Sequence, residues 1–386
     1  MSILIIFKYF YFLNQAVFDL TAVFGLKWPM PNLNIILPVG ISFYIFQAVG
    51  YMIDVYRGDL NAEKHFGIYA LFVSFFPQLV AGPIERAAHL LPQFREIKTY
   101  NSENLKIGLK LILWGFFMKL VVADRLALYV NATYNNVEMH NGTTFLLSSI
   151  LFAFQIYCDF AGYSNIAIGS AKILGFNLMD NFKRPYFAKN INDFWSRWHI
   201  SLSTWFRDYV YIPLGGNRIG KQKNYRNILI TFLVSGFWHG ANWTFILWGA
   251  LHGTYSVISK VFNIAKLKNR KLSFLNITFI ILNFCVVGLF WIFFRANTMN
   301  DAFNIIYKIF TSQGIPFIGS STTLIYGFIG LIVLFASEFV EEYYPSVFVD
   351  DSGVKTTLNI IYYAFLTLLI LAIGVFDGSQ FIYFQF

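Results

Sequence analysis

The chain has 386 residues, of which 57% are hydrophobic, 20% aromatic and only 13% charged. Soluble globular proteins carry about 25% charged residues, and the mean hydropathy here is +0.55, so the composition excludes a soluble domain and predicts an integral membrane protein. The formal net charge is +9. Cytoplasmic loops of membrane proteins are rich in Lys and Arg, so this charge can be explained without a nucleic-acid partner. The partner that the composition predicts is the lipid bilayer.

Apolar stretches recur along the whole length, which predicts an all-α, polytopic fold. A membrane-spanning helix needs about 20 residues, so we expect the two longest stretches, of 32 and 36 residues, to break. With such breaks the chain has roughly 9–10 membrane segments, including re-entrant or broken helices. The stretches are 1–18, 34–53, 66–82, 105–131, 143–174, 227–262, 274–294, 322–340 and 356–376.

The first stretch is not expected to be a signal peptide, because it has no small-residue cleavage site and holds Lys8. The two cysteines, Cys158 and Cys285, lie in apolar stretches, which disfavours a disulfide framework and a thiolate metal site. Since no group of His or Cys has ligand spacing either, we expect no metal.

The third stretch is followed by Gly82-Pro83 and a charged pair ending at Arg86. Pro83 is expected to end or kink the helix there, with Arg86 facing the cytoplasm.

In the stretch 143–174, Asp159 is expected to have a partner, because an unpaired carboxylate in apolar surroundings is very costly. An Arg, a hydroxyl or a wet cavity would serve, and a structural bond and a catalytic role both remain open for Asp159. Gly162, three residues on, permits a helix break.

Residues 180–226 form a polar middle segment rich in Lys, Arg and Trp. Asn192 is suited to cap a helix that begins near Asp193, and Asp193 and Arg197 are spaced as an i,i+4 ion pair. The apolar residues then recur at helical spacing, with Trp195 and His199 beside that stripe, which predicts an amphipathic helix at the cytoplasmic interface. A simple membrane-surface helix is the alternative. The stripe consists of Phe194, Trp198, Leu202, Trp205 and Tyr209.

His239 lies within the long apolar stretch 227–262, between Gly236 and Gly240. Polar residues at membrane depth cost about 2.5–3.5 kcal/mol and are usually functional, although a core histidine bonded to a neighbouring helix is the alternative. The basic loops 218–226 and 266–271 flank the stretch and should both be cytoplasmic. The chain should therefore enter the membrane, turn at His239 and return, whereas one long tilted helix is the competing geometry.

Four ordered strings carry a family resemblance that covers nearly the whole chain. They resemble the membrane-bound O-acyltransferase (MBOAT) superfamily, and within it the bacterial branch of alginate O-acetylases and peptidoglycan O-acetyltransferases. The strings are FFPQLVAGPIERAAHLLPQF (75–94), QIYCDFAGYSNIAIGSAKILGF (155–176), RPYFAKNINDFWSRWHISLSTWFRDYVYIPLGGNR (184–218) and SGFWHGANWTFILWGALHG (235–253).

The resemblance implies one MBOAT-type membrane domain over 1–386, with helices around a central funnel and the cytoplasmic segment 180–226 within it. It also implies that the family's first N-terminal helices are missing from this chain. The family's catalytic intramembrane histidine corresponds to His239, and its second important histidine to His199.

The resemblance and the chemistry together predict acetyl transfer. Acetyl-CoA is the expected cytoplasmic donor, and Trp195, Trp198 and Arg207 lie where it would approach. The expected acceptor is an extracytoplasmic glycan hydroxyl, such as one of alginate or peptidoglycan, reached directly or through a periplasmic SGNH-type acetyltransferase. His239 would act as general base, and Asn242 or a backbone N–H beside Gly240 would face the oxyanion.

This reading places the chain in the bacterial cytoplasmic membrane as a multi-pass protein. Two other classes stay open. Intramembrane polar residues and broken helices also suit a transporter, and a non-catalytic scaffold of a polysaccharide-export complex is the third.

Overall fold

The computed structural model describes residues 5–26, 28–29, 40–80, 82–264, 272–345, 353–377 and 381. All regular elements in these ranges are helices, which confirms the all-α prediction. The predicted cytoplasmic loop 266–271 lies outside the described residues.

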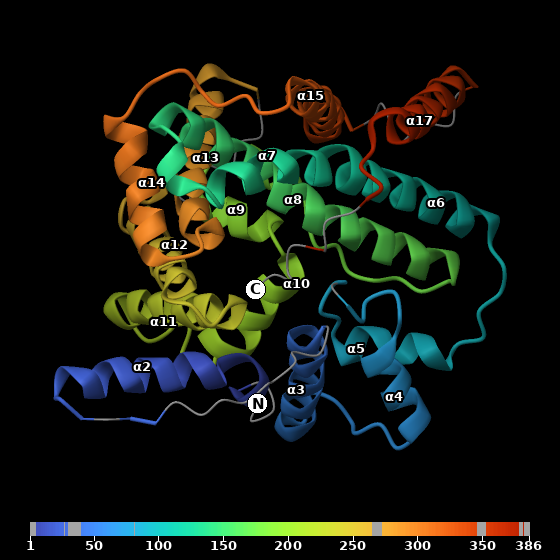
Figure 1. The fold of residues 1–386 in the computed structure, drawn as a ribbon. Coiled ribbons are helices and arrows are strands. Elements are labelled where there is room, and N and C mark those ends of the chain that lie inside the picture. Colours follow the sequence, from blue (N-terminus) through green and yellow to red (C-terminus); the bar gives the residue numbers. More distant parts are fainter. Residues whose placement is uncertain are drawn as a thin grey trace.

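The helices group around α8 (Gly142–Ile173), which runs through the centre of the molecule (Figure 1). The helices α6, α7, α13 and α14 and the π-helical segment η3 pack against it. The bounds of the other helices are η1 (Ile5–Tyr9), α2 (Phe10–Val23), α3 (Ile41–Arg57), α4 (Phe66–Ser74), α5 (Ala87–Leu90), η2 (Pro92–Arg95), α6 (Ser102–Phe116), η3 (Phe117–Ala123), α7 (Asp124–Tyr134), η4 (Val137–Met139), η5 (Pro185–Phe187), α9 (Ile191–Arg197), α10 (Ile200–Phe206), η6 (Arg207–Tyr211), α11 (Lys221–His239), α12 (Trp243–Val261), α13 (Phe274–Arg295), α14 (Met299–Thr311), α15 (Ser321–Tyr343) and α17 (Gly353–Ile373).

The predicted break at Gly162 is wrong, because α8 is continuous over 32 residues. Gly162 instead lets two helix backbones touch. A Cβ atom built at Gly115 of α6 would lie 2.5 Å from the carbonyl oxygen of Gly162, closer than any side chain allows. Small residues at a helix interface therefore place α6 directly against α8.

A buried ion triad joins α8 to η3, the π-helical turn between α6 and α7. Lys119 Nζ lies 2.6 Å from Asp159 Oδ1 and 2.8 Å from Asp124 Oδ1, and both carboxylates are buried. The partner of Asp159 is thus a lysine from a distant segment. The wider helical turn of η3 carries this lysine, and π-bulges often serve to place a side chain in this way.

The long stretch 227–262 breaks, as predicted. Helix α11 ends at His239, Gly240 is extended, and α12 begins at Trp243 and returns alongside α11. A single long tilted helix is therefore excluded. The hairpin is tight because Gly236 and Gly249 face the opposite backbone, with an ideal Cβ at Gly236 only 2.3 Å from the carbonyl oxygen of Phe245.

Gly236→Ala is expected to destabilise the protein by about 1–3 kcal/mol, because the added methyl group must push two backbones apart. Thermal unfolding in detergent measures the loss. Gly288→Ala in α13 is the matched control, since a Cβ there meets no atom within 4 Å. Equal midpoints for the two variants would show that the α11–α12 contact is not tight.

The middle segment is not one amphipathic helix, and that prediction is wrong. It is broken at His199, whose φ is 41°, into α9 and α10, and the cap of α9 is Asn190 rather than Asn192. The predicted stripe nevertheless shares an apolar environment, because Phe194, Trp198, Leu202 and Trp205 are all buried in the protein interior. These residues pack against protein rather than lie on a membrane surface.

The helix of the third stretch ends earlier than Pro83 predicts, at Ser74. Arg86 then follows an extended segment, and its guanidinium lies 3.0 Å from Asp208 Oδ2 and over the Tyr209 ring. Arg86 therefore anchors η6 against the segment that leads into α5.

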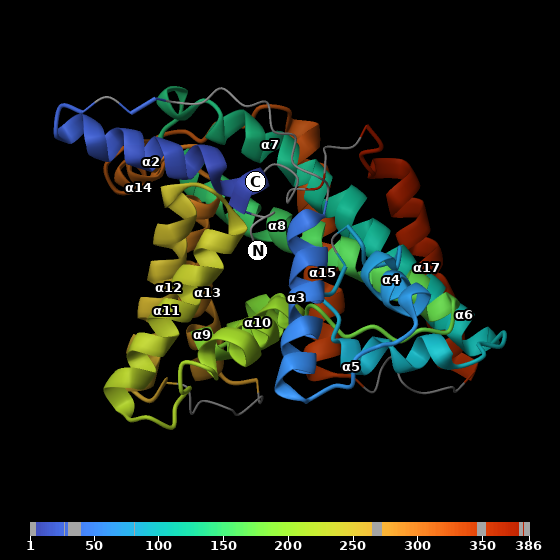
Figure 2. The ribbon, with the colours of Figure 1, turned by 90° about the horizontal axis from the view of Figure 1, so that it is seen from below.

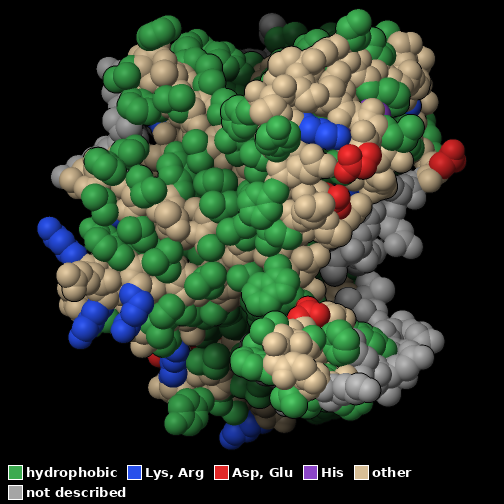
Figure 3. Space-filling view, turned by 60° about the vertical axis from the view of Figure 1, so that its left-hand side comes forward, with side chains coloured by type: hydrophobic (Ala, Val, Ile, Leu, Met, Phe, Trp, Pro, Cys, Tyr) green, Lys and Arg blue, Asp and Glu red, His purple; other side chains and the backbone are tan. Residues whose placement is uncertain are grey.

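Among the described residues, α8, α13 and α15 are long and apolar enough to cross a membrane, and Thr357–Ile373 of α17 is a shorter apolar helix. Large apolar side chains such as Ile332, Leu368 and Leu371 are more than 60% exposed. Figure 3 shows a face covered largely by apolar side chains, with Lys and Arg gathered toward its lower end. Such a surface suits lipid and confirms a membrane protein.

Candidate active site

His239 is the last residue of α11, and its side chain is enclosed by aromatic rings. The centroids of Trp238 and Trp248 lie 4.9 Å from its ring, and that of Phe294 lies 5.2 Å away. His239 is only 4% exposed. The helix end thus places one imidazole in an aromatic enclosure that excludes bulk water.

His199 is brought to the same place, although it stands 40 positions earlier in the chain. Its ring packs 4.5 Å from Phe160 and 6.2 Å from the Trp238 ring, which also contacts His239. His199 is only 1% exposed and therefore lies in the protein interior. The left-handed backbone at His199 turns this side chain inward between α9 and α10.

A cavity of about 480 Å³ lies between the α9–η6 segment and the α11–α12 hairpin. Ser235, one helical turn before His239, belongs to its wall, and the Arg207 side chain, 59% exposed, marks its solvent side. Two of the predicted residues, Trp195 and Arg207, line this cavity. Trp198 is not among the lining residues and packs in the core between Phe182 and Trp291. Phe206, Ser256 and Lys260 also line the cavity.

Asn242 caps α12. Its side-chain oxygen accepts a hydrogen bond from the Thr244 N–H at 3.1 Å, and its amide donates to the Asn297 carbonyl at 3.3 Å. These bonds turn both ends of the amide toward the helix start and the loop after α13. Of the two groups expected to face the oxyanion, a backbone N–H after His239 is therefore the better candidate.

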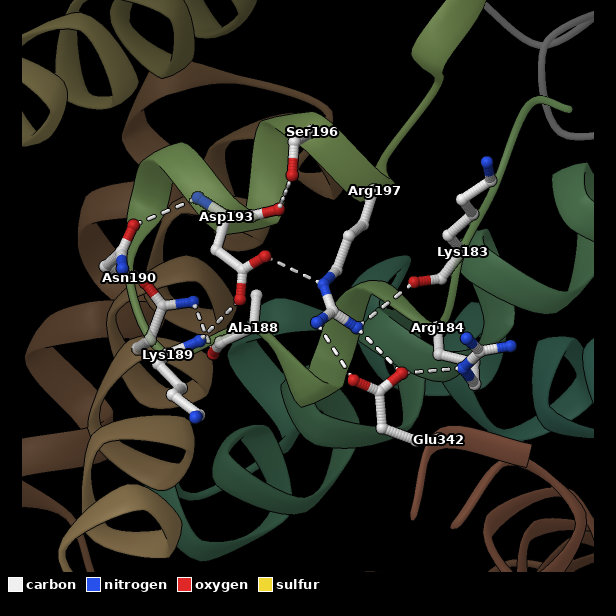
Figure 4. A network of polar contacts seen from close by, with 10 residues as sticks. Lys183, Arg184, Ala188, Lys189, Asn190, Asp193, Ser196, Arg197 and Glu342 are labelled. Atoms are coloured by element: carbon white, nitrogen blue, oxygen red, sulfur yellow. Dashed lines mark hydrogen bonds and ion pairs between the residues drawn. The ribbon is translucent and has the colours of Figure 1, made fainter. Parts of the chain in front are cut away.

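Asp193 belongs to an ion network that links α9 with other segments (Figure 4). The predicted pair with Arg197 is present, with Arg197 Nε 2.9 Å from Asp193 Oδ1. The same guanidinium lies 3.0 Å from both oxygens of Glu342, which Arg184 Nε also contacts at 2.8 Å. Arg197 thus joins α9 to the end of α15, and Asp193 bonds Arg197 within α9. Asp159 makes the bond to Lys119 described above.

Sequence reasoning missed two groups near His239. His252, one turn before Ser256 on α12, is buried with its ring 4.8 Å from Trp248. Lys8 Nζ donates to the carbonyls of Trp238 and His239, at 2.9 Å each. The signals were a second histidine in the apolar stretch and a lone lysine in the first one.

No group of three or more His, Cys, Asp or Glu side chains suited to a metal occurs in the described part of the chain. The chemistry available at the site is that of imidazole, serine and backbone groups beside a cavity.

The fold and the site define an all-helical integral membrane protein with a buried histidine centre beside a cavity. A model of the membrane-bound O-acyltransferase family matches residues 65–294. The chain therefore belongs to the MBOAT family, which confirms the resemblance drawn from the four strings.

Curated relatives come from the branch that the strings indicated. The chain is 40% identical over 313 residues to a probable alginate O-acetylase of Azotobacter vinelandii, a match that covers 80% of this chain and 61% of the relative. It is 37% identical over 313 residues to the peptidoglycan O-acetyltransferase of Helicobacter pylori, covering 73% of this chain and 59% of the relative. The chain thus spans about three fifths of the length of the curated relatives it matches.

A more distant relative is the teichoic acid D-alanyltransferase of Streptococcus thermophilus. It is 32% identical over 246 residues, covering 60% of this chain and 58% of that protein. The names of these three relatives refer to acetylation of alginate, acetylation of peptidoglycan and alanylation of teichoic acid.

Proposed function

We propose that this chain is an O-acyltransferase that moves an acetyl group from a thioester donor, acetyl-CoA, to hydroxyls of an extracytoplasmic glycan. The names of the alginate and peptidoglycan relatives support the acceptor class, with delivery either direct or through a periplasmic SGNH-type acetyltransferase. The protein acts in the bacterial cytoplasmic membrane, which it crosses several times. The observation that carries the proposal is the enclosure of His239 one helical turn from a cavity.

The cavity suits a donor that approaches from the side of the basic residues. Arg207 and Lys260 line it and offer cations for phosphate groups of the donor, while Trp195 and Phe206 offer apolar contact for its thioester arm. Ser235 and Ser256 lie on the two helices of the hairpin that turns after His239. A donor bound here brings its acetyl group toward the imidazole.

The transfer follows from this placement. A ring nitrogen of neutral His239 accepts the proton of the acceptor hydroxyl while the hydroxyl oxygen attacks the thioester carbonyl carbon. The carbonyl electron pair moves to oxygen, where a backbone N–H at Gly240 or Ala241 stabilises it. The C–S bond then breaks, and the departing thiolate takes the proton from the imidazolium. The products are the acetyl ester and the free thiol, and His239 is again neutral. His199 supports this step through the Trp238 ring that both histidines contact.

Ser235→Trp is expected to raise the KM for acetyl-CoA at least tenfold, because an indole would occupy the cavity and cost about 1.4 kcal/mol or more of donor binding. Leu233→Trp is the matched control, since Leu233 lies on the same helix and is 38% exposed. Steady-state kinetics with a fixed acceptor measures the change. An unaltered KM in Ser235→Trp would remove the donor from this cavity.

Purified protein with acetyl-CoA carrying separate labels on the acetyl group and the coenzyme tests the class of function. We expect the acetyl label to pass to a glycan fragment or water and the coenzyme label to remain as free thiol. Movement of both labels together across a vesicle membrane would indicate a transporter. Neither reaction, in protein that is folded and inserted, would indicate a scaffold.

A further inference from the structure

Lys8 is a charged residue in the first apolar stretch, and the catalytic proposal leaves it without a role. It lies in η1, a π-helical turn at the start of α2, and α2 lies across one end of the α11–α12 hairpin (Figure 2). A lysine in such a position is costly and marks a functional contact by default. Its contact is the end of α11, because Nζ lies 2.9 Å from the carbonyl oxygens of both Trp238 and His239.

These carbonyl groups lie at the C-terminal end of α11 and need hydrogen-bond donors from outside the helix. The last four carbonyls of an α-helix have no partner within the helix, and the chain leaves α11 in an extended conformation at Gly240. The segment η1 supplies the donors from more than 200 residues away. Beside Lys8, the Tyr9 hydroxyl donates to the Phe237 carbonyl at 2.7 Å and its ring stacks on Phe237 at 4.1 Å.

Lys8 also places a positive charge next to the backbone of His239. A cation is favourable at the negative end of a helix dipole, and this ammonium is bonded to the carbonyl of the histidine itself. A nearby positive charge disfavours a second one in low dielectric, so it favours the neutral imidazole that can accept a proton.

Among the described residues, the other titratable groups around His239 include His199, His252, Tyr9 and Arg295. His199 and His252 pack against Trp238 and Trp248, the two tryptophans whose rings also contact His239. Each of them carries a positive charge only when its imidazole is protonated. The Tyr9 hydroxyl donates to the Phe237 carbonyl. Arg295 follows Phe294, but its guanidinium bonds Asn131 and lies over Tyr134, on the other side of α13.

We propose that Lys8 is a positioning residue for His239: its ammonium holds the end of α11 in place and keeps the imidazole in the form that accepts the acceptor's proton. This role rests on the proposed function of His239 as base. It makes η1 part of the working site, although η1 lies outside the residues that the family model matches.

The test separates the charge from the hydrogen bonds. Lys8→Gln keeps a donor and removes the charge, Lys8→Arg keeps the charge, and Tyr9→Phe removes a hydrogen bond to the same helix end without changing any charge. In Lys8→Gln we expect the acid limb of the pH–rate profile to move by about one pH unit to higher pH, with an activity loss of about tenfold on that limb. Lys8→Arg should restore the limb, and Tyr9→Phe should lower thermal stability while leaving the limb in place.

A limb in Lys8→Gln that coincides with that of wild type, or one that moves equally in Tyr9→Phe, would overturn the proposal. A readout without turnover covers variants that lose activity: the imidazole ¹⁵N shifts of His239 against pH, assigned by their loss in His239→Gln. The titration should move in Lys8→Gln and not in Tyr9→Phe. Failure of the proposed function has a different signature, because His239→Gln would then transfer acetyl groups as well as wild type does.

Discussion

His239→Ala is expected to lower the rate of acetyl transfer by about 10²–10⁴-fold, the usual contribution of a general base. The imidazole lies one helical turn from the cavity, and the rings of Trp238, Trp248 and Phe294 enclose it. The measurement is transfer of labelled acetyl groups by purified protein, at equal amounts of folded variant and wild type.

His140→Ala is the control for this loss. His140 also packs against aromatic rings, those of Phe145 and Phe317, but it lies in the loop after η4, away from the cavity. The His140→Ala protein should transfer acetyl groups at the wild-type rate. A His239→Ala protein that is folded and fully active would refute the assignment of the base.

Lys119→Met should cause the largest loss of stability, about 3–5 kcal/mol, because it leaves two buried carboxylates without their cation. Asp124 and Asp159 are 2% and 3% exposed, and Lys119 contacts both. The triad also joins η3 to the central helix α8. The expected result is a large drop in the unfolding midpoint in detergent, with loss of inserted protein in cells.

Lys106→Met on α6 provides the comparison. Its side chain is 69% exposed, and its ammonium lies 3.9 Å from Glu103, so its removal should change stability by less than about 0.5 kcal/mol. If the two variants unfolded alike, the triad would not be a structural bond, and a functional role for Asp159 would become the better account.

The sequence was informative for several features that depend on near neighbours. Composition predicted the helical membrane class, and the i,i+4 spacing predicted the Asp193–Arg197 pair. The glycines around His239 predicted the end of α11 because a chain that must turn inside an apolar stretch needs residues without side-chain bulk.

Features set by distant partners were not predictable. Gly162 has the same local signature as a helix breaker, but it faces Gly115 of another helix, and α8 continues through it. The left-handed turn at His199 divides the segment between the buried Trp198 and Leu202, whereas helical spacing alone favours one continuous helix.

Contacts across long sequence separations complete the structure. Glu342 reaches Arg197 from 145 positions away, and Lys8 reaches His239 from 231 positions away. Neither pairing has any periodic signal. A lone charge in an apolar stretch does indicate that a partner exists, and this is the only hint that the sequence held for Lys8.

The most direct test of the central claim uses sealed proteoliposomes with acetyl-CoA inside and the glycan acceptor, with its periplasmic partner where one is needed, outside. Wild-type protein oriented with residues 180–226 inward should place labelled acetyl esters on the outer acceptor while the coenzyme stays inside, and His239→Ala should not. Acetylation that continues in His239→Ala, or coenzyme that leaves with its acetyl group, would contradict transfer by His239.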